Sequence, residues 1–214
     1  MTEWMRRTVG TGMVRLSHRL MLLMSEQRRV VGVELSSFML QSRYKLVFFG
    51  RVQRALELIA LYEPRRLDRI RRDVRMICGI SGGPNHYQHV DRMIMLSLPG
   101  VLYGSPAELA MTIIHEATHG RIIDRGIQYD VENRDRIEAA CVRQEAAFAR
   151  CLPGGEALAD AELAKLERPW WSDQSLQEGQ LQHARAEELP SWFIRMMERS
   201  FARRAARAAA AARR

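Results

Sequence analysis

The stretch SPAELAMTIIHEATHGRIIDRG, residues 105–126, carries the clearest local signals in the chain. Ser105 is suited to the N-cap of a helix, a proline follows at the first helical position, and Glu108 stands where a capping box has its acid. Gly126 is suited to the position just after the last turn. We therefore predict a helix over 107–125.

The segments around this helix predict a fold of the α+β class that is mostly α-helical. Residues 88–98 contain a nearly continuous apolar run, which is typical of a strand covered on both faces, and residues 101–103 are suited to a short return strand. Helical periodicity and flanking proline or glycine residues indicate further helices. They are expected at residues 44–62, 65–77, about 133–152, 156–167, 174–188 and from 191 onward.

Charge and loop signals predict three regions along the 214 residues. The loop sequence SGGPN at 81–85 predicts a boundary. It separates a basic helical N-terminal region at 1–80 from a core with C-terminal helices at 81–200, and an Ala/Arg-rich tail follows at 201–214. Basic residues are in excess in the first and last regions. Acidic residues are in excess in the middle, where a cation would bind.

Arginine is interleaved with Leu, Met and Val at helical spacing near the N-terminus, so residues 13–29 predict a basic amphipathic helix. Packing on the domain, docking to a partner, and contact with an anionic membrane surface or nucleic acid all stay open for it. The start of the chain does not resemble a secretory signal, and the three cysteines lack CxxC spacing. A cytoplasmic location is expected, with peripheral attachment to a membrane as the alternative.

Residues 115–119 read HEATH and match the HExxH pattern. His115 and His119 are four positions apart, so they lie one turn from each other on the same helix face and can bind one ion. Zinc accepts neutral nitrogen ligands in a tetrahedral site. Glu116 lies beside this face, where it can take a proton from a water molecule on the metal and pass it to a leaving group. We therefore predict a Zn²⁺ site and a hydrolytic reaction.

Over about residues 88–150 the chain resembles the zincin metallopeptidases, specifically their gluzincin branch, whose third zinc ligand is a glutamate on a following helix. Glu138 follows His119 in the HExxH-x18-E spacing of gluzincin aminopeptidases. The resemblance implies a small zincin-like core, an edge strand that pairs with an extended peptide or protein substrate, and a second, ligand-bearing helix. The metzincin continuation is absent, because Ile122 and Arg125 stand where that pattern has glycine and histidine or aspartate.

Glu138 and Glu145 are the two leading candidates for the third metal ligand. Glu138 also falls where a capping box has its acid, if Asp135 caps the helix. Glu145 lies almost two turns further along the same face, so it is either the ligand or a partner that fixes a histidine ring. Cys141 is expected to be a small buried residue, although thiolate sulfur also binds zinc. The less favoured candidates are Asp124, Asp130 and Glu132.

Tyr129 and His183 are candidates for stabilising a developing oxyanion. His86 and His89 are expected to be ordinary loop residues, with a substrate rim or a second metal site as the alternative. The favoured function is a zinc-dependent peptidase that acts on amide bonds. The alternative is a non-catalytic, zinc-stabilised binding or regulatory module that contacts nucleic acid or an anionic membrane through the basic ends of the chain.

Overall fold

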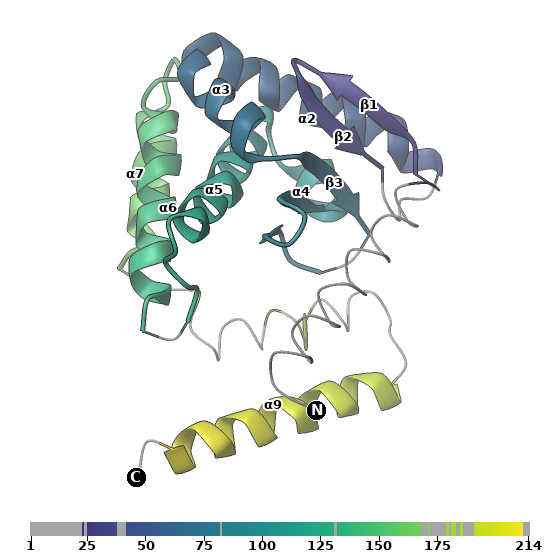
Figure 1. Cartoon of the computed structure of the whole chain (residues 1–214), viewed down its shortest axis with the longest axis vertical. Helices are drawn as coiled ribbons and strands as arrows, with labels where there is room; N and C mark the ends of the chain where they lie inside the picture. The colour runs from purple at the N-terminus through teal and green to yellow at the C-terminus, as the bar shows by residue number, and fades with distance from the viewer. Residues whose placement is uncertain are drawn as a thin grey trace. The chain divides into compact units, whose positions relative to one another are not determined.

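In the described part of the chain, five strands form one mixed sheet, in the order β1-β2-β3-β5-β4. Figure 1 labels the first three of them. β2, β3 and β5 pair in parallel in the middle of the sheet, whereas β1 and β4 are antiparallel edge strands. The strands are Gln27–Val30 (β1), Val33–Ser36 (β2), Met76–Ile80 (β3), His86–Gln88 (β4) and Met93–Ser97 (β5). Parallel pairs need long crossover connections, so helices lie between β2 and β3 along the chain.

The structure is a computed structural model, and it divides into two compact units, Met1–Arg168 and Pro169–Arg214, each of which is described by itself. The described residues are 23, 25–37, 42–81, 83–130, 132–167, 171, 179, 181–182, 185 and 191–211.

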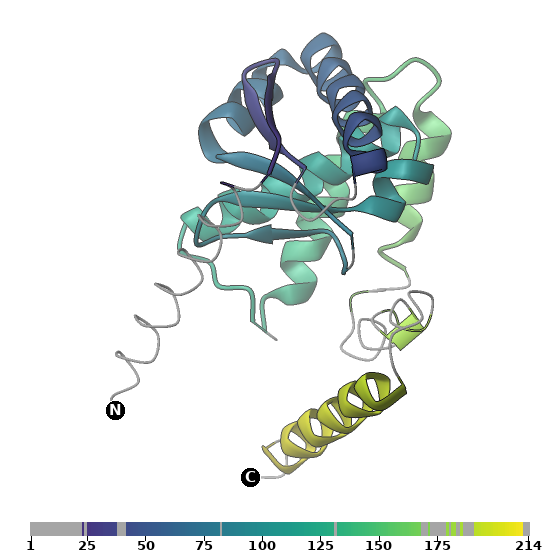
Figure 2. The ribbon, with the colours of Figure 1, turned by 90° about the vertical axis from the view of Figure 1, so that its right-hand side faces the viewer.

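The helices of the first unit pack on the sheet and on each other (Figures 1 and 2). α5 contacts α2, α3 and α6 as well as the strands β4 and β5, and α6 contacts α7 in turn. The helices of this unit are Ser42–Tyr62 (α2), Pro64–Asp73 (α3), Leu98–Tyr103 (α4), Pro106–Asp124 (α5), Arg134–Ala149 (α6) and Glu156–Ala164 (α7). The helices predicted at 44–62, 107–125, 133–152 and 156–167 are confirmed, within a few residues at each end.

The neighbouring strands β3 and β5 are buried on both faces. Ile77 and Ile94 belong to the main core together with apolar residues of α2 and α5. Met76 and Met93 belong to a second buried cluster, because alternate residues of a strand point to opposite faces. The prediction that the apolar run in 88–98 contains a strand covered on both faces is therefore confirmed for β5.

The single strand predicted at 88–98 is nevertheless wrong in extent, because this stretch holds the end of β4, a turn and β5. The side-chain Oε1 of Gln88 accepts hydrogen bonds from the backbone N–H groups of Val90 and Asp91, at 2.6 and 3.3 Å. Arg92 then takes a positive φ of 54°. The turn lacks glycine, proline and asparagine, which usually mark turns in a sequence. The edge strand ahead of α5 is therefore β4, and β5 lies inside the sheet.

Two other sequence expectations are also corrected. The return strand at 101–103 is instead part of the short helix α4, which has Pro99 in its first turn, where proline favours a helix. The helix predicted at 65–77 ends at Asp73. Val74 is extended there, with φ −109° and ψ 122°, and leads into the buried strand β3.

The basic helix predicted at 13–29 lies largely outside the described residues. Its last part is not helical, because Gln27–Val30 forms β1. Val31 and Gly32 join β1 to β2 with φ values of 41° and 81°, so both occupy the left-handed region that a two-residue hairpin turn of this kind requires. β3 ends at Ile80 and pairs with β2 on one side and with β5 on the other, so the sheet includes strands from both sides of the boundary expected there.

In the second unit, the helix α9 spans Ser191–Ala211, so the alanine- and arginine-rich residues 201–211 continue a helix. Within this unit Arg185 and Glu198 form an ion pair with N···O at 3.1 Å. The helix predicted at 174–188 lies mostly outside the described residues. Among the described helices, none combines the length and the apolar character that a membrane span requires.

Candidate functional site

α5 begins with the capping box that its sequence predicts. Ser105 Oγ accepts a hydrogen bond from the backbone N–H of Glu108 at 3.2 Å, and Glu108 Oε2 accepts one from the backbone N–H of Ser105 at 2.7 Å. Ile113, Ile114 and Ala117 are buried in the main core. The start of the helix and its apolar face therefore fix the rotation of α5, and with it the direction in which His115 and His119 point.

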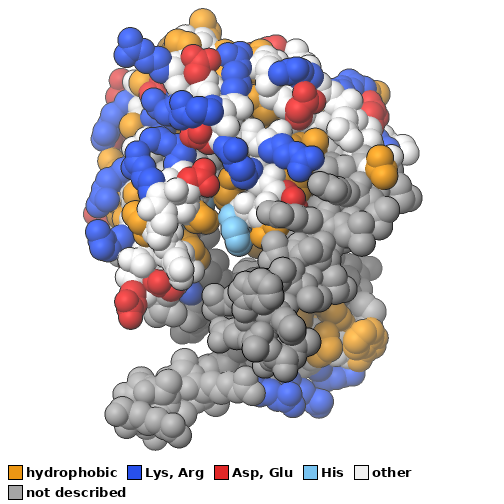
Figure 3. Space-filling view, in the orientation of Figure 1, with side chains coloured by type: hydrophobic (Ala, Val, Ile, Leu, Met, Phe, Trp, Pro, Cys, Tyr) orange, Lys and Arg blue, Asp and Glu red, His pale blue; other side chains and the backbone are white. Residues whose placement is uncertain are grey.

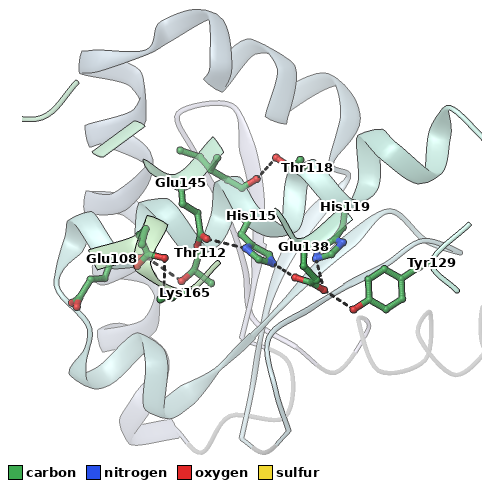
Figure 4. Close-up of polar contacts among 11 residues, drawn as sticks. Glu108, Thr112, His115, Thr118, His119, Tyr129, Glu138, Glu145 and Lys165 are labelled. Atoms are coloured by element: carbon green, nitrogen blue, oxygen red, sulfur yellow. Dashed lines mark hydrogen bonds and ion pairs between the residues drawn. The ribbon is translucent and has the colours of Figure 1, made fainter. Parts of the chain in front are cut away.

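α6 lies along α5 and presents three candidate residues to it, of which Glu138 and Glu145 are labelled in Figure 4. Glu138, Cys141 and Glu145 are spaced by three and four positions, so they lie on one face of α6. All three are buried, at 4, 0 and 7% relative exposure. Carboxylates are almost never buried to this extent without a partner, so this face of α6 is built around polar contacts with α5.

Glu138 lies between the two histidines. Its Oε2 is 3.2 Å from His115 Nε2, and its Oε1 is 3.6 Å from His119 Nε2. The imidazole rings are 4.9 Å apart between centroids. The Nε2 atoms of both histidines thus face the same carboxylate, as Figure 4 shows.

Glu145 contacts the other side of the His115 ring. Its Oε2 is 3.0 Å from His115 Nδ1. A carboxylate on Nδ1 fixes the ring and leaves Nε2 directed at Glu138, which is the arrangement found around metal-bound histidines. Of the two glutamates, Glu138 therefore contacts both histidines, whereas Glu145 contacts only the Nδ1 side of His115.

The three less favoured acids lie away from this cluster. Asp124, Asp130 and Glu132 are all exposed. Asp130 Oδ1 instead accepts a hydrogen bond from the backbone N–H of Asn133 at 2.9 Å, just before α6. The expectation that Asp135 and Glu138 form a capping box is wrong, since Asn133 occupies the N-cap position of α6 and makes no side-chain cap.

Cys141 belongs to the cluster as well, which its sequence context did not predict. The ligand atoms of His115, His119 and Cys141 all lie within 4.8 Å of one another, close enough to hold a metal ion. Burial raises the pKa of the Cys141 thiol, and the carboxylates of Glu138 and Glu116 raise it further. The signal in the sequence was its place one turn after Glu138, on the same helix face.

The donor set fits a zinc ion. His115 and His119 lie close to the Cys141 thiol and contact the Glu138 carboxylate. Imidazole nitrogen, thiolate sulfur and carboxylate oxygen are all ligand types that zinc accepts. Glu138 Oε2 is buried and lies 3.2 Å from His115 Nε2, but it accepts no well-aligned hydrogen bond. A cation beside this oxygen would complete its contacts.

The charges of the site are strongly coupled. Although burial opposes it, contact with Glu138 and Glu145 raises the pKa of His115 to about 10. Burial and the neighbouring His115 lower the pKa of His119 to about 4. Burial tends to raise the pKa of Glu138, but His115, His119 and Tyr129 outweigh it and lower that pKa. His115, whose pKa is raised, and Glu138, whose pKa is lowered, therefore form a charged pair, and a metal ion bound at His115 Nε2 would displace the proton from that nitrogen.

Glu116 is 5% exposed and lies on the same turn as His115. Burial raises the pKa of its carboxyl to about 7, although His115 opposes the shift. The backbone of Tyr87 in β4 interacts with this carboxyl group. The edge strand thus runs directly beside the residue that the HExxH pattern assigns to proton transfer.

Gly120 permits this close approach of β4 to α5, and its role was not evident from the sequence. A Cβ atom at Gly120 would lie 2.5 Å from Cζ and 2.7 Å from Cε2 of Tyr87. Any larger residue would therefore overlap the tyrosine ring. The glycine directly after the second histidine allows the edge strand to lie against α5.

Of the two oxyanion candidates, Tyr129 lies at the site, while His183 is outside the described residues. The hydroxyl of Tyr129 donates a hydrogen bond to Glu138 Oε1, and its ring meets the His119 ring edge-on at 5.5 Å. Tyr129 is 41% exposed, so it lies between the buried cluster and solvent.

The histidines near β4 do not join the cluster. His86 is exposed, with Nδ1 3.0 Å from the carbonyl oxygen of Pro84. His89 is exposed and lines a groove of about 470 Å³ together with Ile123, Ile127 and Tyr129. Tyr129 is thus shared by the groove and the cluster, so the groove opens beside the candidate metal ligands.

Known proteins provide no identification. No protein-family model matches the chain, and neither a curated protein nor a solved structure matches it.

Proposed function

We propose that this chain is a zinc-dependent hydrolase of the gluzincin type that cleaves amide bonds in peptides or proteins. The proposal rests on one observation: Nε2 of His115 and Nε2 of His119 approach the two oxygens of a single buried carboxylate, Glu138, at 3.2 and 3.6 Å. In the sequence these residues have the HExxH-x18-E spacing. The spacing and the contacts both support Glu138 as the third ligand.

Three side chains would hold the zinc ion: His115 and His119 through Nε2, and Glu138 through its carboxylate. When bound, zinc supplies a Lewis acid that polarises a carbonyl group and acidifies water. Glu145 would keep His115 oriented through its 3.0 Å contact with Nδ1. Cys141 is the alternative third ligand because its sulfur lies in the same cluster.

The proposed roles of the surrounding residues follow from their positions. Glu116 takes a proton from the attacking water and passes it to the departing amine, as a general base and then a general acid. The outer edge of β4 pairs with no other described strand, so it can pair with an extended substrate. Tyr129 is exposed enough to meet substrate, and its hydroxyl can donate to a developing oxyanion once it leaves Glu138.

Metal analysis combined with two substitutions tests this function. Purified wild-type protein should contain one zinc per chain and hydrolyse a mixed peptide library. Glu116→Gln should keep the zinc and lose hydrolysis, while His119→Ala should lose both. Glu132→Gln is the matched control, because it removes an exposed acid outside the cluster and should retain both. Wild-type protein that binds zinc but hydrolyses no peptide in the library would favour a non-catalytic zinc-stabilised module instead. A wild-type protein that binds no zinc would refute the proposal.

The third ligand is tested separately by cobalt substitution. Glu138→Ala should weaken metal binding strongly, whereas Cys141→Ser should leave it nearly unchanged. If Cys141 is not a ligand, the cobalt-loaded wild type will lack thiolate-to-cobalt charge-transfer absorption in the near ultraviolet. The presence of that absorption, and its loss in Cys141→Ser, would assign the third position to sulfur.

A further inference from the structure

A second polar cluster lies between α3 and α5, on a different face of α5 from the histidines. Arg66, Arg69 and Asp73 of α3, together with Thr118 and Arg121 of α5, line a small pocket of about 10 Å³. Such a volume admits roughly one water-sized group. Figure 3 shows Lys and Arg side chains gathered over the part of the surface where Figure 1 places α3.

The arginines of this pocket differ in the acidic and hydrogen-bonding partners that they have within the described residues. Arg66 is buried and is paired with Glu63, and its Nη1 donates to Gln144 at 2.9 Å. Arg69, by contrast, forms no hydrogen bond or ion pair within the described part of the chain, and its Nε is buried without a partner. A buried guanidinium donor without an acceptor is unfavourable, so an acceptor from outside the chain would stabilise this position.

Arg121 has only a weak acidic partner. Its Nε is 4.0 Å from Asp73 Oδ2. Asp73 is already engaged by Arg72, whose Nε lies 2.8 Å from Asp73 Oδ1. Asp73 is therefore the acidic partner of two arginines, so the pocket carries more positive than negative charge.

We propose that this pocket is an anion-binding site that takes a phosphate-sized oxyanion, either free phosphate or a phosphate monoester. One oxygen of the anion would enter the pocket and accept from Arg69, and the remaining oxygens would stay at the mouth within reach of Arg121. Guanidinium groups match phosphate oxygens with several parallel N–H donors, so arginine suits this ligand better than lysine does. The site is independent of zinc and of the hydrolase proposed above.

Calorimetric titration of the full chain with inorganic phosphate, at constant ionic strength, tests the site. We expect one saturable site per chain. Arg69→Gln and Arg121→Gln should each weaken phosphate binding at least about tenfold, because each removes a charge-assisted hydrogen bond. Arg65→Gln is the matched control, since it removes the same charge from the same helix at an exposed position outside the pocket. It should change the affinity by less than about twofold.

Further measurements separate this site from other sources of binding. His119→Ala should still bind phosphate, because it disrupts the candidate metal cluster and leaves the α3–α5 pocket intact. Repeating the titration with a soluble phosphate monoester, phosphatidic acid vesicles and duplex DNA identifies the source of the phosphate group. Equal weakening by Arg65→Gln and Arg69→Gln would show a diffuse basic surface and overturn the proposal. Loss of binding in His119→Ala, or the absence of saturable phosphate binding, would also overturn it. Circular dichroism confirms folding of each variant, and Arg121→Gln remains informative if Arg69→Gln does not fold.

Discussion

Replacing Gly120 with alanine should destabilise the protein, although the same change in the interior of a helix normally stabilises it. The new Cβ would lie 2.5 Å from Tyr87 Cζ, whereas ordinary contacts begin at 3.4 Å. The tyrosine ring or the edge strand must therefore move by about 1 Å. Tyr87 packs against the main core, so its ring cannot swing away without losing contacts.

The magnitude follows from two opposing effects. Overpacking of this kind costs about 1–3 kcal/mol, while replacing glycine by alanine inside a helix contributes about 1 kcal/mol of stabilisation. The net loss in the free energy of unfolding should be up to about 2 kcal/mol. For a chain of this size, that corresponds to a fall in Tm of up to about 8 °C.

Gly50 provides the control. It lies inside α2, is exposed, and has nothing within 4 Å of an added Cβ. Gly50→Ala should therefore raise the stability by about 1 kcal/mol. Urea titrations of both variants, repeated in a Tyr87→Ala background, form a double-mutant cycle. In that background Gly120→Ala should become stabilising. If Gly120→Ala stabilises the protein as much as Gly50→Ala does when Tyr87 is present, β4 does not lie against α5 as described.

Three further outcomes are expected. Ser105→Ala removes the N-cap of α5 and should lower the free energy of unfolding by about 0.5–2 kcal/mol in a urea titration; an unchanged value would show that the cap contributes nothing. Glu145→Gln should weaken zinc binding about 10–100-fold in a chelator competition, because it weakens the contact that orients the imidazole; an unaltered affinity would contradict this orienting role. At pH 8 Cys151, which is exposed, should react quickly with a thiol reagent, whereas Cys78 should react only on unfolding. Burial raises the pKa of Cys78 to about 12, so at pH 8 its thiol keeps the proton and lacks the reactive thiolate form; equal reaction rates would contradict this burial.

The local features of α5 could be predicted from the sequence because their causes are local. The capping box needs only Ser105 and Glu108, and a spacing of four places His115 and His119 on one helix face whatever surrounds it. The spacing of seven between Glu138 and Glu145 likewise puts both on one face of α6. Which of them meets which nitrogen depends on how α5 and α6 pack, and that information is not local.

The missed features all depend on contacts between distant segments or on an unusual turn. Gln88 closes the β4–β5 turn with its side chain, so the usual turn residues are absent and the two strands look like one. Arg28 and Arg29 fit a helical period as well as a strand, and only pairing with β2 decides between them. The fit of Gly120 to the ring of Tyr87 joins residues from a helix and a strand, and no pattern along the chain encodes it.

Every member of the candidate metal cluster comes from α5 and α6, and this has a consequence for the order of folding. The contact between His115 and Glu145 closes a loop of only 30 residues, and it lies within one helical hairpin. The parallel pairing of Leu35 with Ile77 closes a longer loop, which contains the helices α2 and α3. Short closures between adjacent helices form sooner than parallel strand pairing. In pulse-labelled hydrogen exchange, the amides of α5 and α6 should therefore gain protection before those of β2 and β3, so that the histidines and glutamates meet while the sheet is still assembling.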